Sequence, residues 1–348
     1  MSKNLDQIEN SSHILVLGMG GTIAGLAPNP EGKPSSYKAG ELAVETLLAK
    51  IQEAIPGDLK VVSQQLANID SRDLGEDLLT LLANTVKDLL GNPAVQGIVI
   101  THGTDTVEEA GFFLSATCGK LAEKLGKRVI LTGAMLPANA PQADGPLNLL
   151  DALKWAATAP ENCPGGIFAV FAGKVCLARD LAKRHTSALN APLMDAPSSP
   201  LGLINPGWMS RLRAVQAALG EDLPIPEGEW PWVEILTSHA GARPLVIELL
   251  INSGVQGIVL AGTGLGGLHE AWSHPLKQAA KKGVALVKTS RTGAGVLAEE
   301  SEDAVAATSL SAPRARIALQ LALNAAKVDK SLTWQDFFAR IAVLPEFR

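Results

Sequence analysis

The sequence has few cysteines, and none of them is arranged in a recognisable pair. Only 3 of its 348 residues are cysteine, namely Cys118, Cys163 and Cys176. Their wide spacing contains no CxxC motif, which argues against a zinc or redox site, and their odd number argues against a disulfide framework. We therefore expect reduced thiols and a cytoplasmic protein.

Charged residues are also scarce, at 19% of the chain, and the two signs nearly balance. The 30 Lys and Arg against 35 Asp and Glu leave a net charge of −5, without a long block of like charges. This pattern argues against nucleic-acid binding. Residues 1–12 are polar, unlike a secretory signal, and no run of about 18 uncharged apolar residues follows, so neither export nor membrane insertion is expected.

Apolar and turn-forming residues, by contrast, are abundant: 47% of residues are hydrophobic, with 33 glycines and 21 prolines. The length suffices for two domains, each with its own core. Short β-branched apolar runs alternate with stretches of helical spacing, which predicts an α/β fold whose parallel strands are buried on both faces. The expected strands are 13–17, 97–101, 128–132, 166–172, 233–237, 257–261 and 285–289, and the expected helices are 42–54, 75–90, 145–157, 245–253 and 275–282.

A proline-rich stretch at 190–229 interrupts this alternation. Proline fixes φ and removes a backbone donor, so the stretch is the best candidate for loop and linker between domains. We expect a larger N-terminal domain over residues 1–213, a linker over 214–230, and a smaller C-terminal α/β domain over 231–348.

Residues that follow the strands are the candidates for chemistry, because ligands of an open parallel sheet bind beyond the carboxyl ends of its strands. After the first strand, the glycine-rich residues 18–25 expose backbone amides beside the hydroxyl of Thr22. This pattern fits a nucleophile beside an anion-binding turn. On the turn alone, a tight turn that happens to hold a threonine is the favoured interpretation.

The segment 101–109 follows the strand at 97–101 and is rich in hydroxyl and acidic side chains. Thr106 is expected to cap a helix that begins near residue 107, with Glu109 completing a capping box. Capping leaves Thr104 and Asp105 without a structural role. His102 is interpreted as a residue that packs the turn.

A threonine hydroxyl is a poor nucleophile and must lose its proton to a neighbouring base. Lys183 follows the strand at 166–172 and, if desolvated, can act as a neutral amine base in the same crevice. Alone it would be interpreted as a solvated surface lysine. Thr104, Lys183 and Asp105 together are predicted to form a hydroxyl, a base and an orienting carboxylate.

Three motifs, in order along the chain, resemble the bacterial-type L-asparaginase (asparaginase/glutaminase) family. They are residues 20–25, 101–109, and 132–135 continuing to 143–148, and residues 320–323 match as well. The resemblance implies an amidohydrolase that cleaves the side-chain amide of L-asparagine to aspartate and ammonia through a threonine nucleophile. It also implies a Rossmann-like N-terminal domain that carries the catalytic threonines, and a homotetramer built from dimers, with sites between paired subunits.

Residue roles follow from the same resemblance. Thr22 matches the nucleophile that forms the acyl-enzyme, and Tyr37 matches a residue of a mobile lid. Thr104, Asp105 and Lys183 match the second catalytic group, in which Asp105 also binds the ammonium of the substrate. Backbone amides near Thr22 and Thr104 are natural donors to the oxyanion.

The sequence departs from the family at the substrate-binding positions. Ser71 matches the residue that binds the α-carboxylate, but Arg72 replaces the usual glutamine after it and is expected to contact the substrate. Gly241 stands where relatives place an asparagine of the neighbouring subunit. No glutamate aligns with a second residue of that subunit, although Glu299 and Glu300 lie near. Asparagine, glutamine and other small amides thus remain open as substrates.

Two other classes of protein compete with this interpretation. Residues 262–267 satisfy GxGxxG after a predicted strand, which is also typical of a dinucleotide-binding protein. A non-catalytic small-ligand-binding protein is suggested by Arg72 and Gly241, against the complete set of catalytic matches. The six scattered histidines contain no HExxH motif, and neither a metal nor a cofactor is expected.

The Arg72→Gln variant is expected to gain activity on asparagine relative to other amides, because it restores the neutral donor that the family carries. An ammonia-release assay that compares kcat/KM for asparagine and glutamine in both proteins checks this. An unchanged ratio would show that Arg72 points away from the ligand.

Overall fold

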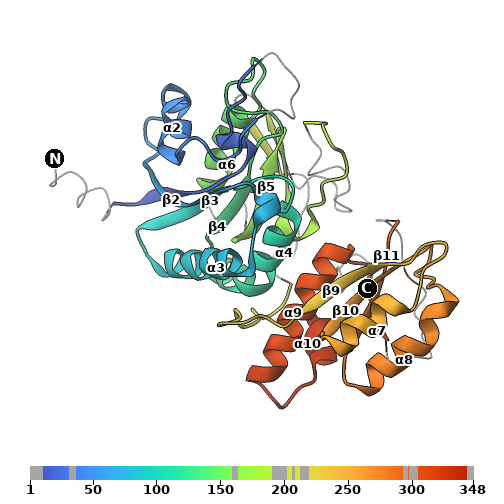
Figure 1. Cartoon of the computed structure of the whole chain (residues 1–348). Coiled ribbons are helices and arrows are strands. Elements are labelled where there is room, and N and C mark those ends of the chain that lie inside the picture. Colours follow the sequence, from blue (N-terminus) through green and yellow to red (C-terminus); the bar gives the residue numbers. More distant parts are fainter. Residues whose placement is uncertain are drawn as a thin grey trace. The chain divides into compact units, whose positions relative to one another are not determined.

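Figure 1 shows a computed structural model of the chain. It describes residues 11–30, 37–158, 164–189, 202–205, 208–211, 219–292, 297 and 305–342, so Cys163, Glu299 and Glu300 lie outside the described residues. The chain divides into two compact units, Met1–Asp222 and Leu223–Arg348. Each unit holds one sheet, which confirms the expected two-part α/β fold.

The sheet of the first unit has the strand order β2-β1-β3-β4-β5-β6-β7-β8. Its first five strands in this order are parallel, and four of them were predicted, at 13–17, 97–101, 128–132 and 166–172. The strands are β1 (His13–Gly20), β2 (Val61–Ile69), β3 (Val95–Thr101), β4 (Arg128–Thr132), β5 (Gly166–Phe171), β6 (Lys174–Leu177), β7 (Gly202–Asn205) and β8 (Trp208–Arg211).

The strands β6, β7 and β8 extend the sheet in antiparallel fashion, which the sequence pattern did not predict. β5 and β6 are joined by Ala172 and Gly173 alone, with φ values of 48° and 69°. Positive φ at both positions matches the twist of a two-residue hairpin turn. An alanine at the first of them carries no hairpin signal, so the turn was read as the end of a strand.

Helices cover both faces of this sheet, α2 and α6 on one and α3 and α4 on the other (Figure 1). Side chains of β1 alternate between the two faces of the sheet. Those of Ile14 and Val16 are buried in the core that includes residues of α2 and α6. The helices are α2 (Val44–Ala49), α3 (Glu76–Gly91), α4 (Val107–Thr117), α5 (Gly119–Lys124) and α6 (Gly145–Ala156). The expected helix 42–54 is in fact α2 followed by a separate 3-10 turn, η2 (Gln52–Ala54).

The second unit contains a four-stranded parallel sheet of order β12-β11-β10-β9. Its strands are β9 (Val233–Thr237), β10 (Gly257–Gly262), β11 (Ala285–Ser290) and β12 (Val305–Ala307), and its helices are α7 (Leu245–Asn252), α8 (Ser273–Lys281), α9 (Ala312–Val328) and α10 (Trp334–Ile341). Among the described residues of both units, no helix is long and apolar enough to cross a membrane.

Candidate functional site

Turns after three neighbouring strands meet at the carboxyl edge of the first sheet. Thr22 begins η1 (Thr22–Ala24) after β1, Ser71 begins η3 (Ser71–Asp73) after β2, and Thr104 follows β3. All three side chains are buried, with 7%, 3% and 3% of their surface exposed. The order β2-β1-β3 in the sheet therefore brings together residues that lie far apart in the sequence.

Two glycines allow these turns to touch. A Cβ atom on Gly21 would lie 2.5 Å from the Cα of Gly103, and a Cβ on Gly103 would lie 2.4 Å from the Oγ of Ser71. Gly21 also has a φ of 80°, which side chains disfavour. Glycine at both positions is thus required for the approach of the Thr22 turn to the Thr104 turn.

Thr22 contacts Tyr37, the only tyrosine in the chain. Its Oγ1 lies 2.7 Å from the hydroxyl of Tyr37. The segment that carries Tyr37 is held beside η1, because Leu26 and Lys38 exchange two backbone hydrogen bonds of 3.0 Å. This arrangement provides a hydroxyl partner to which a Thr22 proton can pass.

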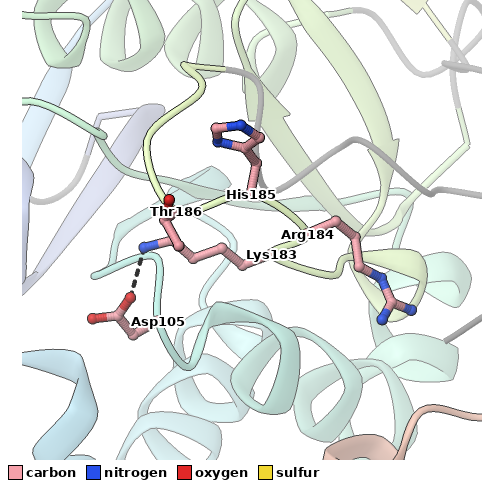
Figure 2. Close-up of a pocket in the computed structure, with 5 residues that line it drawn as sticks. All are labelled: Asp105, Lys183, Arg184, His185 and Thr186. Atoms are coloured by element: carbon pink, nitrogen blue, oxygen red, sulfur yellow. Dashed lines mark hydrogen bonds and ion pairs between the residues drawn. The ribbon is translucent and has the colours of Figure 1, made fainter. Parts of the chain in front are cut away.

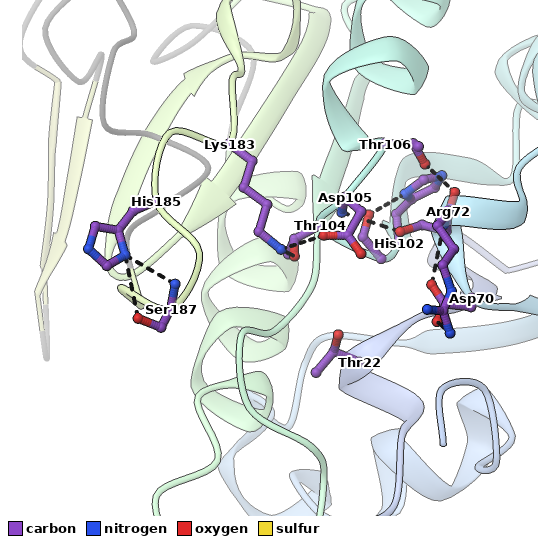
Figure 3. A network of polar contacts seen from close by, with 12 residues as sticks. Thr22, Asp70, Arg72, His102, Thr104, Asp105, Thr106, Lys183, His185 and Ser187 are labelled. Carbon is purple, nitrogen blue, oxygen red and sulfur yellow. Dashed lines mark hydrogen bonds and ion pairs between the residues drawn. The ribbon is translucent and has the colours of Figure 1, made fainter. Parts of the chain in front are cut away.

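Lys183 reaches the turn after β3 from a different part of the chain. Its Nζ donates to Thr104 Oγ1 at 2.9 Å and forms an ion pair with Asp105 Oδ1 at 2.6 Å. The lysine side chain is 21% exposed and the aspartate side chain 50%. Figure 3 shows these three side chains together, and Thr22 on the neighbouring turn. The structure thus brings the predicted hydroxyl, amine and carboxylate into direct contact.

The approach of Lys183 depends on η4 (Ala178–Asp180), which packs against α4. A Cβ on Gly111 of α4 would lie 2.7 Å from the backbone oxygen of Ala178. Within η4, Arg179 and Asp180 are both buried, and Arg179 Nε lies 3.9 Å from Asp180 Oδ1. Because α4 begins just after Asp105, one helix supports both halves of the Lys183 contact.

Ser71 lies beneath the Thr104 turn and binds it through two hydrogen bonds. Its Oγ accepts from the backbone N of Asp105 at 3.3 Å, and its backbone oxygen accepts from Thr106 Oγ1 at 2.7 Å. The expected capping box at α4 is therefore wrong: Thr106 makes no side-chain cap hydrogen bond, because its hydroxyl is committed to Ser71.

Arg72 forms an ion pair with a neighbouring carboxylate. Its Nη2 lies 2.9 Å from Asp70 Oδ2, and its side chain is 73% exposed. Asp70 also accepts from the backbone N of Arg72 at 3.2 Å. The guanidinium charge is thus balanced within η3 and its cap, and the contact with a substrate that we expect of Arg72 remains a prediction.

A cavity of about 430 Å³ opens beside the Lys183 and Asp105 pair (Figure 2). Its described lining also includes Arg184, His185 and Thr186. These three residues were missed in the sequence, where adjacency to Lys183 is their only signal. The cavity gives a small ligand access to the amine and the carboxylate.

The turn after β4 explains the third sequence motif in structural terms. The carboxylate of Asp144 accepts from the backbone N of Met135 at 2.9 Å and of Leu136 at 3.0 Å. Asn148 donates to the oxygen of Gly133 at 3.0 Å and accepts from the backbone N of Ala172 at 2.9 Å. These hydrogen bonds fix the fourth turn of the sheet edge.

Two backbone N–H donors at the site are candidates for binding a ligand oxygen. Within the described part of the chain, the N–H groups of Thr22 and Thr104 have no hydrogen-bond acceptor. An unpaired N–H beside a buried hydroxyl is available to a ligand oxygen. The touching turns thus offer donors for negative charge as well as candidate nucleophiles.

The GxGxxG segment of the second unit lacks the geometry of a dinucleotide site. Gly266 N and Gly267 N both donate to the oxygen of Thr263, at 3.0 and 2.7 Å. The loop therefore closes on itself, and α8 begins only at Ser273. Amides that are already bonded are not free to bind a pyrophosphate at a helix N-terminus.

Comparison with known proteins agrees with these observations. Residues 13–213 match the family model "Asparaginase, N-terminal", and residues 232–334 match "Glutaminase/Asparaginase C-terminal domain". The chain is 32% identical to L-asparaginase 2 of Bacillus subtilis (strain 168), covering 93% of this chain and 85% of that protein. It is 34% identical to L-asparaginase 2 of Escherichia coli (strain K12), covering 90% of each. The crystal structure of a probable cytoplasmic L-asparaginase from Campylobacter jejuni is similar, with a TM-score of 0.79 and 30% identity, covering 95% of this chain and 100% of that chain.

The Gly111→Ala variant is expected to displace η4 and lengthen the contact between Lys183 and Thr104, because the new Cβ collides with the oxygen of Ala178. Overpacking of this kind lowers the free energy of unfolding by about 1–3 kcal/mol. Urea unfolding and a crystal structure of the variant measure the two effects. Gly91→Ala is the matched control, since a Cβ at that position of α3 meets nothing within 4 Å. An unmoved Lys183 would contradict the anchoring role of Gly111.

Proposed function

Because the chain belongs to the asparaginase family of amidohydrolases, we propose that it hydrolyses the side-chain amide of L-asparagine to aspartate and ammonia. The observation that carries this proposal is the contact of Lys183 with both Thr104 and Asp105, on a turn that touches the one holding Thr22. The site thereby holds two hydroxyls, an amine and a carboxylate in one small region.

Thr22 is the proposed nucleophile. Its Oγ1 attacks the amide carbon while its proton passes to the hydroxyl oxygen of Tyr37, which lies 2.7 Å away and gives its own proton to the amide nitrogen. The carbonyl oxygen becomes an oxyanion, which the N–H groups of Thr22 and Thr104 are available to stabilise. Collapse of this intermediate breaks the C–N bond, releases ammonia that carries the proton relayed through Tyr37, and leaves an ester on Thr22 that water then hydrolyses.

Thr104, Lys183 and Asp105 form the proposed second catalytic group. In its neutral amine form Lys183 can take a proton from Thr104, and the resulting ammonium is stabilised by Asp105, whose Oδ1 is 2.6 Å from Nζ. The Thr104 oxygen can then draw a proton from a substrate or water molecule. This group provides the proton transfers that a threonine hydroxyl cannot perform alone.

Substrate binding is assigned to Asp105, which lines the cavity, and to the neighbouring turn that holds Ser71 and Arg72. Asp105 is half exposed, so its carboxylate can pair with the substrate ammonium, and Ser71 on the adjoining turn is the proposed partner of the α-carboxylate. Arg72 adjoins Ser71 and is proposed to influence that contact. Glutamine, or another small amide, is the alternative substrate, since one extra methylene is worth only about 1–3 kcal/mol of discrimination.

A cytoplasmic homotetramer built from dimers is the proposed form of the enzyme. The resemblance extends over both family domains, and the similar structure from Campylobacter jejuni is named as probably cytoplasmic. Cys118 and Cys176 are buried free thiols, which suits a reducing compartment.

Light scattering of the purified protein is expected to give the mass of four chains. The physical reason is that each site of the proposed assembly is completed by a neighbouring subunit. A monomeric mass together with full activity would contradict shared sites.

The Thr22→Ala and Thr104→Val variants are each expected to lower kcat for ammonia release from asparagine by about 10²–10⁴-fold, because each loses a group that transfers protons or forms the acyl-enzyme. Steady-state ammonia release measures the change, and thermal unfolding checks the fold. Thr85→Val is the matched control, since the hydroxyl of Thr85 donates to the backbone oxygen of Leu81 within α3. Near-normal turnover by either site variant would remove that residue from the catalytic set.

A further inference from the structure

His102 stands directly before the Gly103-Thr104 peptide, and the proposed reaction gives it no role. Its side chain is only 1% exposed, and its Nδ1 lies 2.8 Å from the backbone oxygen of Gly103. A carbonyl oxygen only accepts, so Nδ1 must carry the hydrogen, and the lone pair of the neutral ring is on Nε2. Burial lowers the pKa of His102, which favours this neutral form.

The hydrogen bond from His102 sets the direction of a second group. The Gly103 carbonyl and the Thr104 N–H belong to one peptide unit, and the described part of the chain contains no cis peptide bond. In a trans peptide these two groups point in opposite directions. The imidazole of His102, by holding the Gly103 oxygen, therefore also fixes the direction of the Thr104 N–H bond. This N–H has no acceptor among the described residues.

The backbone at His102, which precedes this peptide, is held by two contacts. His102 N donates to the oxygen of Thr132 at 2.8 Å, and a Cβ on Gly133 would lie 2.3 Å from the oxygen of His102. Gly103 is the first residue without such an anchor, and contact with Ser71 excludes any side chain there. Glycine backbone rotates most freely, so an external hydrogen bond is needed to hold its carbonyl.

We propose that His102 is a positioning residue, which orients the Thr104 N–H as a donor to the oxyanion by holding the Gly103 carbonyl. This inference rests on the proposed function. An oxyanion donor acts on the transition state more than on the bound substrate. Loss of the His102 hydrogen bond therefore lowers kcat and leaves KM nearly unchanged.

The test compares three variants of the full-length protein. His102→Leu fills the space without a donor, and is expected to lower kcat for asparagine by about 10–10³-fold with KM within about threefold. His102→Asn places an amide donor where Nδ1 stands and is expected to retain kcat within about fivefold. His102→Gln places its amide nearer the Nε2 position and is expected to lose activity as the leucine variant does.

The outcomes separate this inference from the proposed function. Wild-type ammonia release decides the proposed function by itself, while a crystal structure of His102→Leu shows whether the peptide between Gly103 and Thr104 has rotated. The inference is overturned by wild-type kcat in His102→Leu, by equal loss in the asparagine and leucine variants when both are folded, or by an unrotated peptide. If His102→Leu does not fold, the asparagine and glutamine pair gives the same comparison, and equal activity of the two overturns it.

Discussion

The close approach of two glycine-containing turns is the constraint on which the rest of the site depends. Gly21 and Gly103 lie so near that a Cβ on Gly21 would be 2.5 Å from the other backbone. This contact sets the two threonine turns side by side at the end of β1 and β3, where ligands of a parallel sheet bind. A methyl group at either glycine would separate the nucleophile proposed at Thr22 from the proton-transfer group proposed at Thr104.

The ion pair of Lys183 and Asp105 contributes more to the proposed proton transfers than to the stability of the fold. Lys183 and Asp105 are 21% and 50% exposed, and ion pairs that water reaches contribute little to the free energy of folding. The segment before Lys183 is held instead by buried contacts of η4 with α4, at Gly111 and Ala178. Rigid packing thus carries the geometry, and Asp105 stays open to the cavity.

Errors of the sequence interpretation have identifiable physical causes. β2 was missed because it is the edge strand of its sheet, with residues mostly half-buried or exposed, and shows no continuous apolar run. The capping box at Thr106 was wrong because a partner 35 positions earlier, the Ser71 oxygen, takes the hydroxyl. Local sequence patterns predict hydrogen bonds between neighbouring residues. They do not show that an acceptor from a distant turn competes for the same hydroxyl.

The amino-acid sequence by itself determined the α/β alternation, most of the buried parallel strands, and a short set of candidate residues, because hydrophobic period and residue chemistry are local properties. Only the tertiary structure decided that Lys183 meets Thr104 across 79 positions, that Thr22 meets Tyr37, and that His102 bonds to the oxygen of Gly103. The order of the strands and the packing of the turns set those distances, and neither can be predicted from a single segment of the sequence.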